Sequence, residues 1–429
     1  MKAAIIAGGK GERIRSISHD LIPKALVPVA GKPILFFQLE QLRRYGVTDV
    51  GLILGHLAQD VRTRMSDAPT AHTLRIHYFE EKSPLGTAGG LLQAKDFFKD
   101  GDFFVLYGDI AFDIDLNHLM AFHKKQAALA TIIAHPNDHP LTSDLLKVDA
   151  AQRLLEILPA KTRTPGDYRN LVPAALYCFS PKLFDFIRVS EKQDFIHDVF
   201  PALLKKGEKI AVYSTPEYLR DIGTPERLKM VEKDIQTGFM SRMNREQKRP
   251  TLFLDRDGVI NHDLADTGII RPDQLKLMPT ATEAIKLAND AGFLVVVITN
   301  QPQIAKGFIT VDDLDRIHAR LETELSAGKA WLDRIYYCPH HPDKGFAGEI
   351  PSLKIVCECR KPGIGLFLQA IQELPVDIHR ACMIGDSSRD IMAAKTMKIK
   401  AYGVRAGLDA DQTFNTLLEA VQEAVRVLR

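Results

Sequence analysis

A repeated alternation of β-rich runs with amphipathic segments constrains the fold of this chain more than any other feature. Between the β-rich runs lie segments typical of helices, such as residues 34–46, which Gly46 closes. Strands that alternate with helices at this spacing form βαβ units, so we expect an α/β fold with a mostly parallel, doubly wound sheet. The runs that predict strands in the first half of the chain are 3–9, 50–54, 103–109, 130–135 and 210–214.

The alternation stops at residues 236–249 and then starts again. This stretch loses its apolar periodicity and ends before Pro250, which indicates a linker or a linking helix. Thr310 and Asp313 then have the spacing of a capping box at the start of a helix that reaches Ala327. One hydrophobic core rarely extends over 429 residues. We therefore expect two α/β domains, at 1–235 and 250–429, joined by the linker; the β-rich runs of the second domain are 251–255, 293–300, 381–386 and 400–404.

The composition excludes several classes of protein. The formal net charge is only +2, so no overall positive field marks a nucleic-acid binder. No apolar run reaches the roughly 18 residues that span a bilayer, and the N-terminal residues turn to glycine and charge too early for a signal peptide. We therefore expect a cytoplasmic protein without nucleic-acid or membrane partners. The sequence gives no indication of the oligomeric state.

A glycine-rich loop, AGGKGER at residues 7–13, follows the first predicted strand. Glycine lets backbone N–H groups come close to a phosphate chain, and a following helix N-terminus favours the same anion. Lys24 adds a positive charge, and Asp109 and Asp221 add carboxylates. Ligands of doubly wound sheets bind at the carboxyl ends of strands, so Gly8 and Asp109 should lie at one edge. The alternative for each is a purely structural turn.

These residues, together with PKALVPVAGKP (23–33), LGTAGGL (85–91) and DIGTPE (221–226), resemble the sugar-phosphate nucleotidyltransferase family over residues 1–235. Members of that family transfer a nucleoside monophosphate from a nucleoside triphosphate to a sugar 1-phosphate and release pyrophosphate. In one departure, Pro173-Ala174-Ala175 stand where the family commonly has Asn-Ala-Gly, so the sugar pocket does not follow from the family. The resemblance implies that the triphosphate is held by Gly8, Gly9, Gly11 and Arg13, that its charge is neutralised by Lys24, that the base and ribose lie along Gly86, Thr87 and Ala88, and that Mg²⁺ is bound by Asp109 and Asp221.

A second pair of carboxylates, Asp255 and Asp257, follows the buried-strand pattern TLFL (251–254). Two carboxylates spaced in this way can face one phosphate from different sides. Asp255 would attack phosphorus to form an aspartyl-phosphate. Asp257 would protonate the departing sugar oxygen and then deprotonate the attacking water.

The motif DRDGV (255–259) resembles the haloacid-dehalogenase-like (HAD-like) phosphatases, and further motifs of that family follow in order. The resemblance implies that the Thr299 hydroxyl and the Lys361 cation contact phosphate, and that Asp386 joins Asp255 and Asp257 as a ligand of Mg²⁺. The role of Asp390 stays open, because it could simply hydrogen-bond the loop that carries Asp386.

Three of the five cysteines cluster near histidines, which in a reducing compartment favours a metal site over disulfides. Three thiolates and one imidazole suit a structural, tetrahedral Zn²⁺. We expect the ligands to be Cys338, His340, Cys357 and Cys359, with His340 favoured over His341. The alternative is a loop with reduced thiols. Cys178 and Cys382 lie in apolar runs and are expected in the core.

The CPHH and CECRKP segments, at 338–341 and 357–362, resemble the HAD subgroup of heptose 1,7-bisphosphate and histidinol-phosphate phosphatases. Pro302-Gln303 depart from the Ser-Gly pair that is typical of heptose phosphatases. The segment PKALVPVAGKP is similar to the heptose 1-phosphate guanylyltransferases. Together the resemblances imply a bifunctional enzyme that uses heptose phosphates, with GTP as the expected nucleotide, in two successive steps toward GDP-D-glycero-α-D-manno-heptose. Mg²⁺ is expected in both domains and Zn²⁺ in the second.

Guanine rests on resemblance alone, and other readings remain. The same two chemistries could act on another sugar or nucleotide, or the second domain could take histidinol phosphate. The first domain could only bind a nucleotide sugar and regulate the phosphatase. A zinc-dependent nucleic-acid binder is disfavoured by the near-neutral charge.

Overall fold

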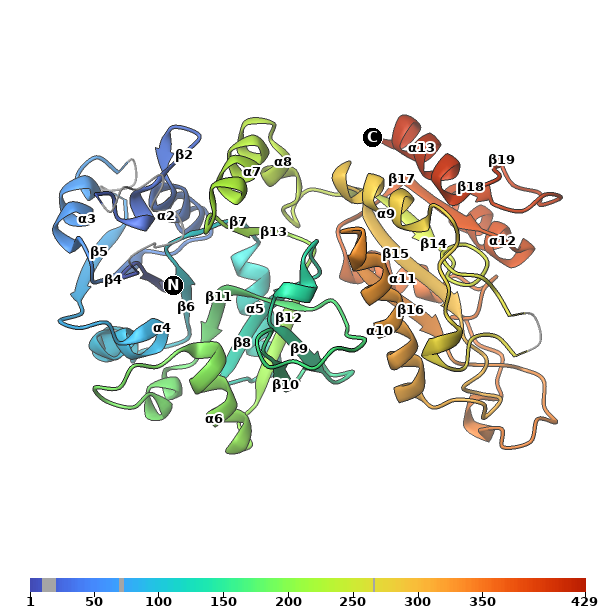
Figure 1. Cartoon of the computed structure of the whole chain (residues 1–429), viewed down its shortest axis with the longest axis horizontal. Coiled ribbons are helices and arrows are strands. Elements are labelled where there is room, and N and C mark those ends of the chain that lie inside the picture. The colour runs from blue at the N-terminus through green and yellow to red at the C-terminus, as the bar shows by residue number, and fades with distance from the viewer. Residues whose placement is uncertain (10–20, 69–72, 265–266) are drawn as a thin grey trace. The chain divides into compact units, whose positions relative to one another are not determined.

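The computed structural model describes residues 1–9, 21–68, 73–264 and 267–429 (Figure 1). The chain forms two compact units. Unit 1 consists of Met1–His135, Leu146–Pro159 and Pro173–Arg245. Unit 2 consists of Pro136–Leu145, Ala160–Val172 and Glu246–Arg429. Two short segments from the first half of the sequence therefore belong to unit 2.

Unit 1 is built on a seven-stranded sheet with the order β12-β8-β11-β6-β1-β4-β5. β1 pairs in parallel with β4 and β6, and β11 runs antiparallel to β6. All five strands that the alternation predicted are present. The strands of the sheet are β1 (Lys2–Ile6), β4 (Asp49–Leu54), β5 (Arg75–Glu80), β6 (Phe103–Tyr107), β8 (Ala130–His135), β11 (Val172–Phe179) and β12 (Ile210–Ser214).

Helices and short two-stranded ribbons complete this part of the chain. The helices are α2 (Ile34–Arg44), α3 (Ala58–Met65), α4 (Gly86–Gly89), α5 (Leu116–Gln126), α6 (Phe200–Lys205), α7 (Pro225–Gln236) and α8 (Phe239–Arg242). The ribbons are β2 (Pro28–Val29) with β3 (Lys32–Pro33), β7 (Ile110–Asp113) with β13 (Tyr218–Asp221), and β9 (Leu145–Val148) with β10 (Leu154–Leu158).

The core of unit 1 explains why the glycine loop lies where it does. Ile5 of β1, Leu52 of β4 and Leu106 of β6 are fully buried in one cluster with Leu39 of α2. Burial of these side chains fixes the three parallel strands in register. The residues that follow β1 and β6 are therefore delivered to the same edge of the sheet.

The segment expected to be a linker or a linking helix, residues 236–249, contains the short helix α8. α7 and α8 lie side by side (Figure 1), and Met240 and Met243 are buried in an apolar cluster with Val231 of α7. The fully buried Asn244 donates hydrogen bonds to Asp113 and Tyr45. Unit 1 thus extends to Arg245.

Unit 2 contains a parallel six-stranded sheet with the order β16-β15-β14-β17-β18-β19. Its strands are β14 (Arg249–Leu254), β15 (Leu294–Asn300), β16 (Arg334–Cys338), β17 (Val376–Gly385), β18 (Lys400–Gly403) and β19 (Gln412–Thr413). Its helices are α9 (Ala281–Asp290), α10 (Val311–Ala327), α11 (Gly365–Glu373), α12 (Ser388–Met397) and α13 (Leu417–Leu428). The two mostly parallel sheets confirm the α/β class.

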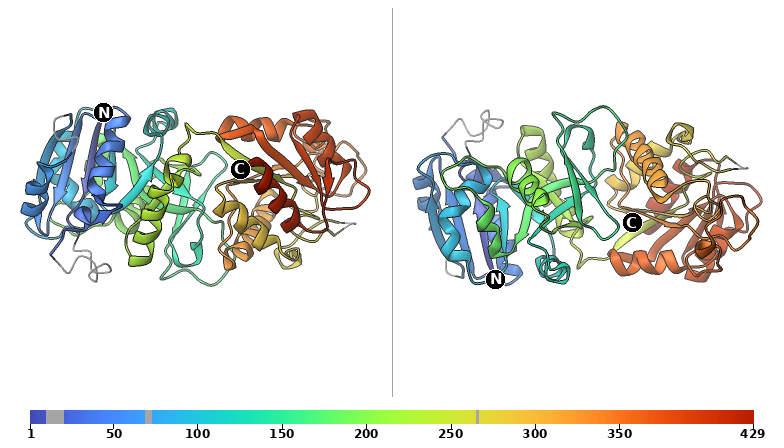
Figure 2. Two further views of the ribbon diagram at one scale, coloured as in Figure 1. Left: turned by 90° about the horizontal axis from the view of Figure 1, so that it is seen from above. Right: turned by 90° about the horizontal axis from the view of Figure 1, so that it is seen from below.

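Local signals and packing set the helices of unit 2. Thr310 caps α10 in a capping box with Asp313, as the sequence predicted. α13 packs against α9 (Figure 2), and the fully buried Ala420 and Ile285 belong to the cluster between them. Among the described residues, no helix is both long and apolar enough to cross a membrane.

Candidate active sites

A pocket of about 260 Å³ opens at the carboxyl edge of the unit 1 sheet. Gly8 and Gly9 after β1, and Asp109 after β6, lie in its wall with Lys24. Gly86 and Thr87 line it from the α4 segment. The structure therefore brings together groups that the sequence predicted would share one site.

Close packing explains two of the glycines. A Cβ atom on Gly86, whose φ is +77°, would lie 2.4 Å from the carbonyl oxygen of Gln193. A Cβ atom on Gly8 would lie 2.7 Å from a carboxylate oxygen of Glu81. At Gly86 the clash is with backbone and the φ is positive, so this part of the pocket wall requires glycine. At Gly8 a side chain would have to displace the Glu81 carboxylate.

Not every residue predicted for the nucleotide site lies in the pocket wall. Ala88 is fully buried in the core, and its backbone N–H bonds to Gln193. The Thr87 hydroxyl is engaged with Asp194 at 2.7 Å, so it serves the loop as well as the pocket. Gly11 and Arg13 lie outside the described residues.

The two aspartates predicted to bind metal come from neighbouring strands. The backbone N–H of Ile222, next to Asp221, bonds to the carbonyl of Asp109 at 2.9 Å. Lys24 forms an ion pair with Asp109. Burial opposes ionisation of Asp221, but Arg227 outweighs it and holds the pKa of that carboxyl below its usual range. Two carboxylates at one edge are a donor set that suits Mg²⁺.

Glu81 is a pocket residue that the motifs did not reveal. It follows β5, and one of its carboxylate oxygens accepts a hydrogen bond from the backbone of Leu85 at 3.2 Å. Burial raises the pKa of this half-buried carboxyl, and the Leu85 bond only partly offsets it. Its position directly after β5, at the same edge of the sheet as the glycine loop, was the available signal.

In unit 2, Lys361 joins two carboxylates at the carboxyl edge of the sheet. Its ammonium group lies 2.9 Å from Asp255 and 2.6 Å from Asp390. Burial opposes the charged form of Lys361, but these carboxylates outweigh it and raise the pKa of the lysine. Asp390 also accepts hydrogen bonds from the backbone and hydroxyl of Ser387. It therefore holds both the loop after Asp386 and the lysine.

The carboxylates around Lys361 carry more negative charge than one lysine balances. Single oxygens of Asp255, Asp386 and Asp390 lie within 4.8 Å of one another. Burial, together with Asp390, raises the pKa of Asp255 to about 7, although Lys361 opposes the shift. Burial and Asp390 likewise raise the pKa of Asp386 to about 6. A divalent cation would relieve this repulsion, so the residues fit Mg²⁺.

Asp257 lies in a different set of contacts. The fully buried Arg256 donates to both of its carboxylate oxygens, at 2.9–3.1 Å. Asn261 and Gln301 donate to it as well, at 2.9 and 2.8 Å. These partners fix the orientation of the carboxylate, and its role as a metal ligand stays a prediction.

Thr299, Asn300 and Gln301 lie at the end of β15, the strand next to β14, which ends before Asp255. The Asn300 side chain bonds to both backbone groups of Lys361, at 3.0 and 3.1 Å. The sequence pointed to Thr299 but not to Asn300 or Gln301, because a motif does not reveal partners that lie far along the chain.

The predicted zinc ligands form one cluster. The Nδ1 atom of His340 lies 3.6 Å from the sulfur of Cys338 and 3.2 Å from that of Cys359. Sulfur–sulfur distances among Cys338, Cys357 and Cys359 are 3.2–3.6 Å. Zn–S bonds of about 2.3 Å give ligand separations only slightly longer, so the cluster fits a tetrahedral Zn²⁺. His341 instead bonds to Asp343.

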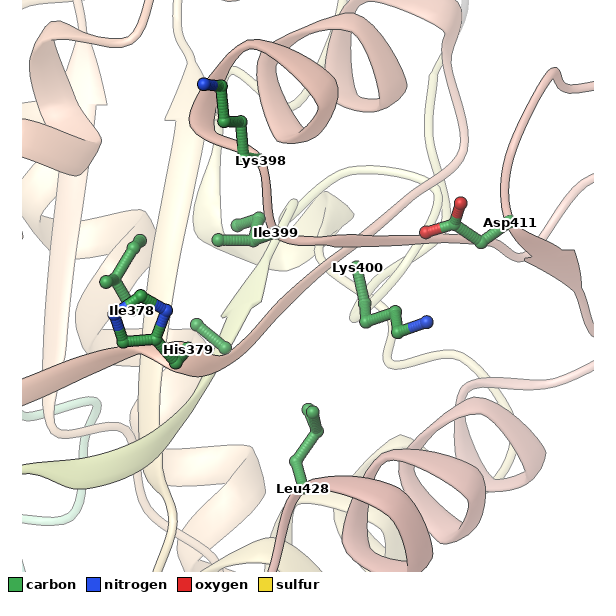
Figure 3. Close-up of a pocket in the computed structure, with 8 residues that line it drawn as sticks. Ile378, His379, Lys398, Ile399, Lys400, Asp411 and Leu428 are labelled. Atoms are coloured by element: carbon green, nitrogen blue, oxygen red, sulfur yellow. The ribbon is translucent and has the colours of Figure 1, made fainter.

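A second hollow lies in unit 2 and is lined by other residues than those around Lys361 (Figure 3). It measures about 280 Å³ and is lined by residues near the start of β17 and β18, including His379 and Lys400, and by Leu428 of α13. Asp255 and Asp386 follow the opposite ends of strands in this parallel sheet. This hollow is therefore not part of the carboxylate site around Lys361.

Comparison with known proteins places both halves of the chain in families. Residues 2–238 match the nucleotidyl transferase family. The chain belongs to this family. Residues 358–426 match the HAD-hydrolase-like family. The chain is 37% identical over 177 residues to the D-glycero-beta-D-manno-heptose-1,7-bisphosphate 7-phosphatase of Rhodopseudomonas palustris, covering 41% of this chain and 94% of that protein. The nucleotidyltransferase is thus fused to a HAD-like phosphatase, and the protein is a bifunctional enzyme.

Relatives of the nucleotidyltransferase half use different bases, according to their names. A UTP–glucose-1-phosphate uridylyltransferase of Synechocystis is 32% identical over 219 residues, which cover 48% of this chain and 56% of that protein. The mannose-1-phosphate guanylyltransferase catalytic subunit beta of Xenopus tropicalis is 30% identical over 269 residues, which cover 62% of this chain and 71% of that protein.

Proposed function

We propose that the enzyme catalyses two successive steps of heptose activation. The phosphatase removes the 7-phosphate of D-glycero-α-D-manno-heptose 1,7-bisphosphate. The nucleotidyltransferase then transfers GMP from GTP to heptose 1-phosphate and releases pyrophosphate. The main support is the fusion itself, because a phosphatase similar to heptose bisphosphate phosphatases would form the sugar 1-phosphate that a nucleotidyltransferase accepts.

In the phosphatase, an oxygen of Asp255 bonds to phosphorus while the bond from phosphorus to the sugar oxygen breaks. Asp257 gives a proton to that sugar oxygen. A water oxygen then bonds to phosphorus, Asp257 takes the proton from this water, and the bond to Asp255 breaks to release phosphate. Lys361 and Thr299 hold the phosphate oxygens. Mg²⁺ bound by Asp255 and Asp386 would add positive charge at the phosphate.

In the nucleotidyltransferase, a phosphate oxygen of the sugar 1-phosphate bonds to the α-phosphorus of the nucleotide as the bond to pyrophosphate breaks. Backbone N–H groups at Gly8 and Gly9 would hold the triphosphate, and Lys24 would shift from Asp109 toward the developing charge. Mg²⁺ held by Asp109 and Asp221 would supply further positive charge. The protein positions the two anions and lowers their repulsion.

Positive charge near the phosphatase site supports a bisphosphate substrate. Arg360 precedes the catalytic Lys361, and burial followed by the repulsion of Arg389 lowers its pKa. Burial and the repulsion of Arg360 and Lys354 likewise lower the pKa of Lys306. A second phosphate would relieve this repulsion, whereas the ammonium group of histidinol phosphate would increase it. We therefore favour the sugar bisphosphate over histidinol phosphate.

Glu81 supports guanine as the base. Its second carboxylate oxygen lies against Gly8, in the wall of the nucleotide pocket. A carboxylate accepts hydrogen bonds and would pair with guanine, which offers two adjacent donors, N1–H and the 2-amino group. Uracil and thymine offer one N–H between two carbonyl oxygens, which a carboxylate would repel.

The decisive experiment follows phosphate and pyrophosphate together. The protein is incubated with Mg²⁺, the α or β anomer of heptose 1,7-bisphosphate, and each common nucleoside triphosphate. We expect phosphate release, and then pyrophosphate release with GTP and the α anomer. Phosphate release without pyrophosphate from any triphosphate would refute the transferase half of the proposal. Preference for the β anomer, which the name of the Rhodopseudomonas relative specifies, would refute the choice of sugar.

Two variants assign the products to their sites. Asp255→Asn should abolish phosphate release and leave pyrophosphate release from added heptose 1-phosphate intact. Asp109→Asn should do the reverse. If Asp255→Asn still released phosphate at the wild-type rate, the nucleophile would be wrongly assigned.

A further inference from the structure

Gln301 is fully buried between three groups of the phosphatase site. Its carbonyl oxygen accepts a hydrogen bond from Arg256 at 3.0 Å. Its amide nitrogen lies 2.8 Å from an oxygen of Asp257 and 2.9 Å from the hydroxyl oxygen of Thr299. It therefore links the proposed acid–base residue to the proposed phosphate contact.

Arg256 determines which way the Gln301 amide faces. A guanidinium group has only donors, so the atom of Gln301 next to it must be the carbonyl oxygen. The amide NH₂ group then has to face Asp257 and Thr299. Its two hydrogens meet two acceptors, which leaves no donor of this side chain without a partner.

This orientation keeps the Thr299 hydroxyl proton from pointing at Gln301. A threonine hydroxyl has one hydrogen to donate and can accept at its oxygen. Gln301 occupies the acceptor side, and within the described part of the chain no other hydrogen bond to this hydroxyl is recorded. The proton is therefore free to point to a phosphate oxygen.

We propose that Gln301 is a positioning residue of the phosphatase, whose amide orients Asp257 for proton transfer and turns the Thr299 hydroxyl proton toward the substrate phosphate. This inference rests on the proposed function, because it takes Asp257 as the acid–base residue and Thr299 as a phosphate contact. Gln301 would act on the reaction through the side chains of Asp257 and Thr299, to which it donates.

The test uses Gln301→Glu in the full-length protein. Glutamate has the same shape but donates no hydrogen bond when ionised, so it would repel Asp257 and turn the Thr299 proton inward. We expect kcat for phosphate release to fall at least about 30-fold, which is less than the complete effect of losing a general acid. The pH profile of kcat should shift, and inhibition by orthovanadate should weaken about tenfold, the effect of losing about one hydrogen bond to a charged group.

Gln303→Glu is the matched control. Gln303 belongs to the same turn and is also buried, but its amide faces Gly268 rather than Asp257 or Thr299. This variant should keep the wild-type pH profile. Zinc content and pyrophosphate release from the other site report on folding of each variant. If Gln301→Glu does not fold, Gln301→Met, which adds no buried charge, takes its place.

A double-mutant cycle separates positioning from a general loss of structure. If Gln301 acts partly through Thr299, then Thr299→Val should cost clearly less activity in the Gln301→Glu background than in the wild type. Additive losses with an unchanged pH profile would overturn the inference. Wild-type activity of Gln301→Glu alongside an inactive Asp255→Asn would also overturn it while leaving the proposed function intact. An active Asp255→Asn would instead refute the proposed function.

Discussion

Replacement of Glu81 by glutamine tests how the nucleotide pocket chooses its base. The carbonyl of glutamine can keep the hydrogen bond from Leu85, which the carboxylate accepts at 3.2 Å, so the loop should keep its conformation. The other oxygen, which lies against Gly8, becomes an NH₂ group. A donor would then face the donors of guanine.

The size of the effect follows from the hydrogen bonds that are lost. A hydrogen bond to a charged group contributes about 1.5–3 kcal/mol. Loss of one such bond corresponds to a decrease of about 10- to 150-fold in kcat/KM for GTP. Uracil gains a donor for one of its carbonyl oxygens, so the preference for GTP over UTP should fall further than the rate with GTP.

The assay is pyrophosphate release from heptose 1-phosphate with GTP and with UTP as competing substrates. Glu80→Gln is a matched control, because Glu80 is exposed and pairs with Arg62. Equal losses with both nucleotides in Glu81→Gln would refute the reasoning. Glu81 would then act only as a structural acceptor for the loop.

Three further outcomes are expected. Removal of zinc by a chelator, or Cys359→Ser, should reduce phosphate release at least about tenfold, because Cys359 lies two residues before Lys361. Pyrophosphate release should stay unchanged, and loss of both activities would contradict a zinc site that serves only the phosphatase. Asn300→Ala should lower kcat for phosphate release more than it raises KM, since it frees the Lys361 backbone; an unchanged kcat would show that the lysine is held without it. Leu252→Ala should lower the free energy of unfolding of unit 2 by about 2–5 kcal/mol, measured by urea titration, because this side chain is fully buried in β14; a loss below about 1 kcal/mol would mean that the cavity closes.

The strands and the aspartates that follow them could be predicted from the sequence because each rests on a local pattern. Alternation of apolar runs predicted the strands, and Thr310 with Asp313 predicted the start of α10. Aspartates directly after strands predicted the edges at which the sites lie. Such signals depend only on residues that are close in the sequence, so they do not require knowledge of contacts with distant parts of the chain.

Other features depend on contacts between distant residues. Met240 and Met243 lie in a stretch without helical periodicity, yet they are buried against α7. Residues 136–145 and 160–172 belong to unit 2, although they lie far before its continuous part, which begins at Glu246. Glu81 and Gln301 carry no motif of their own, and their importance arises from the groups that the folded chain brings to them.

Thr299, Asn300 and Gln301 are three consecutive residues with different partners. Thr299 is the proposed phosphate contact, Asn300 holds the backbone of Lys361, and Gln301 bonds to Arg256 and Asp257. A chemically similar substitution at any one of them would remove its contact, and the side chains on either side could not replace that contact. Pro302 and Gln303 carry no such contacts to these groups. In the evolution of this enzyme, the tripeptide should therefore stay nearly invariant, while new substrate preferences can arise in the two residues that follow it.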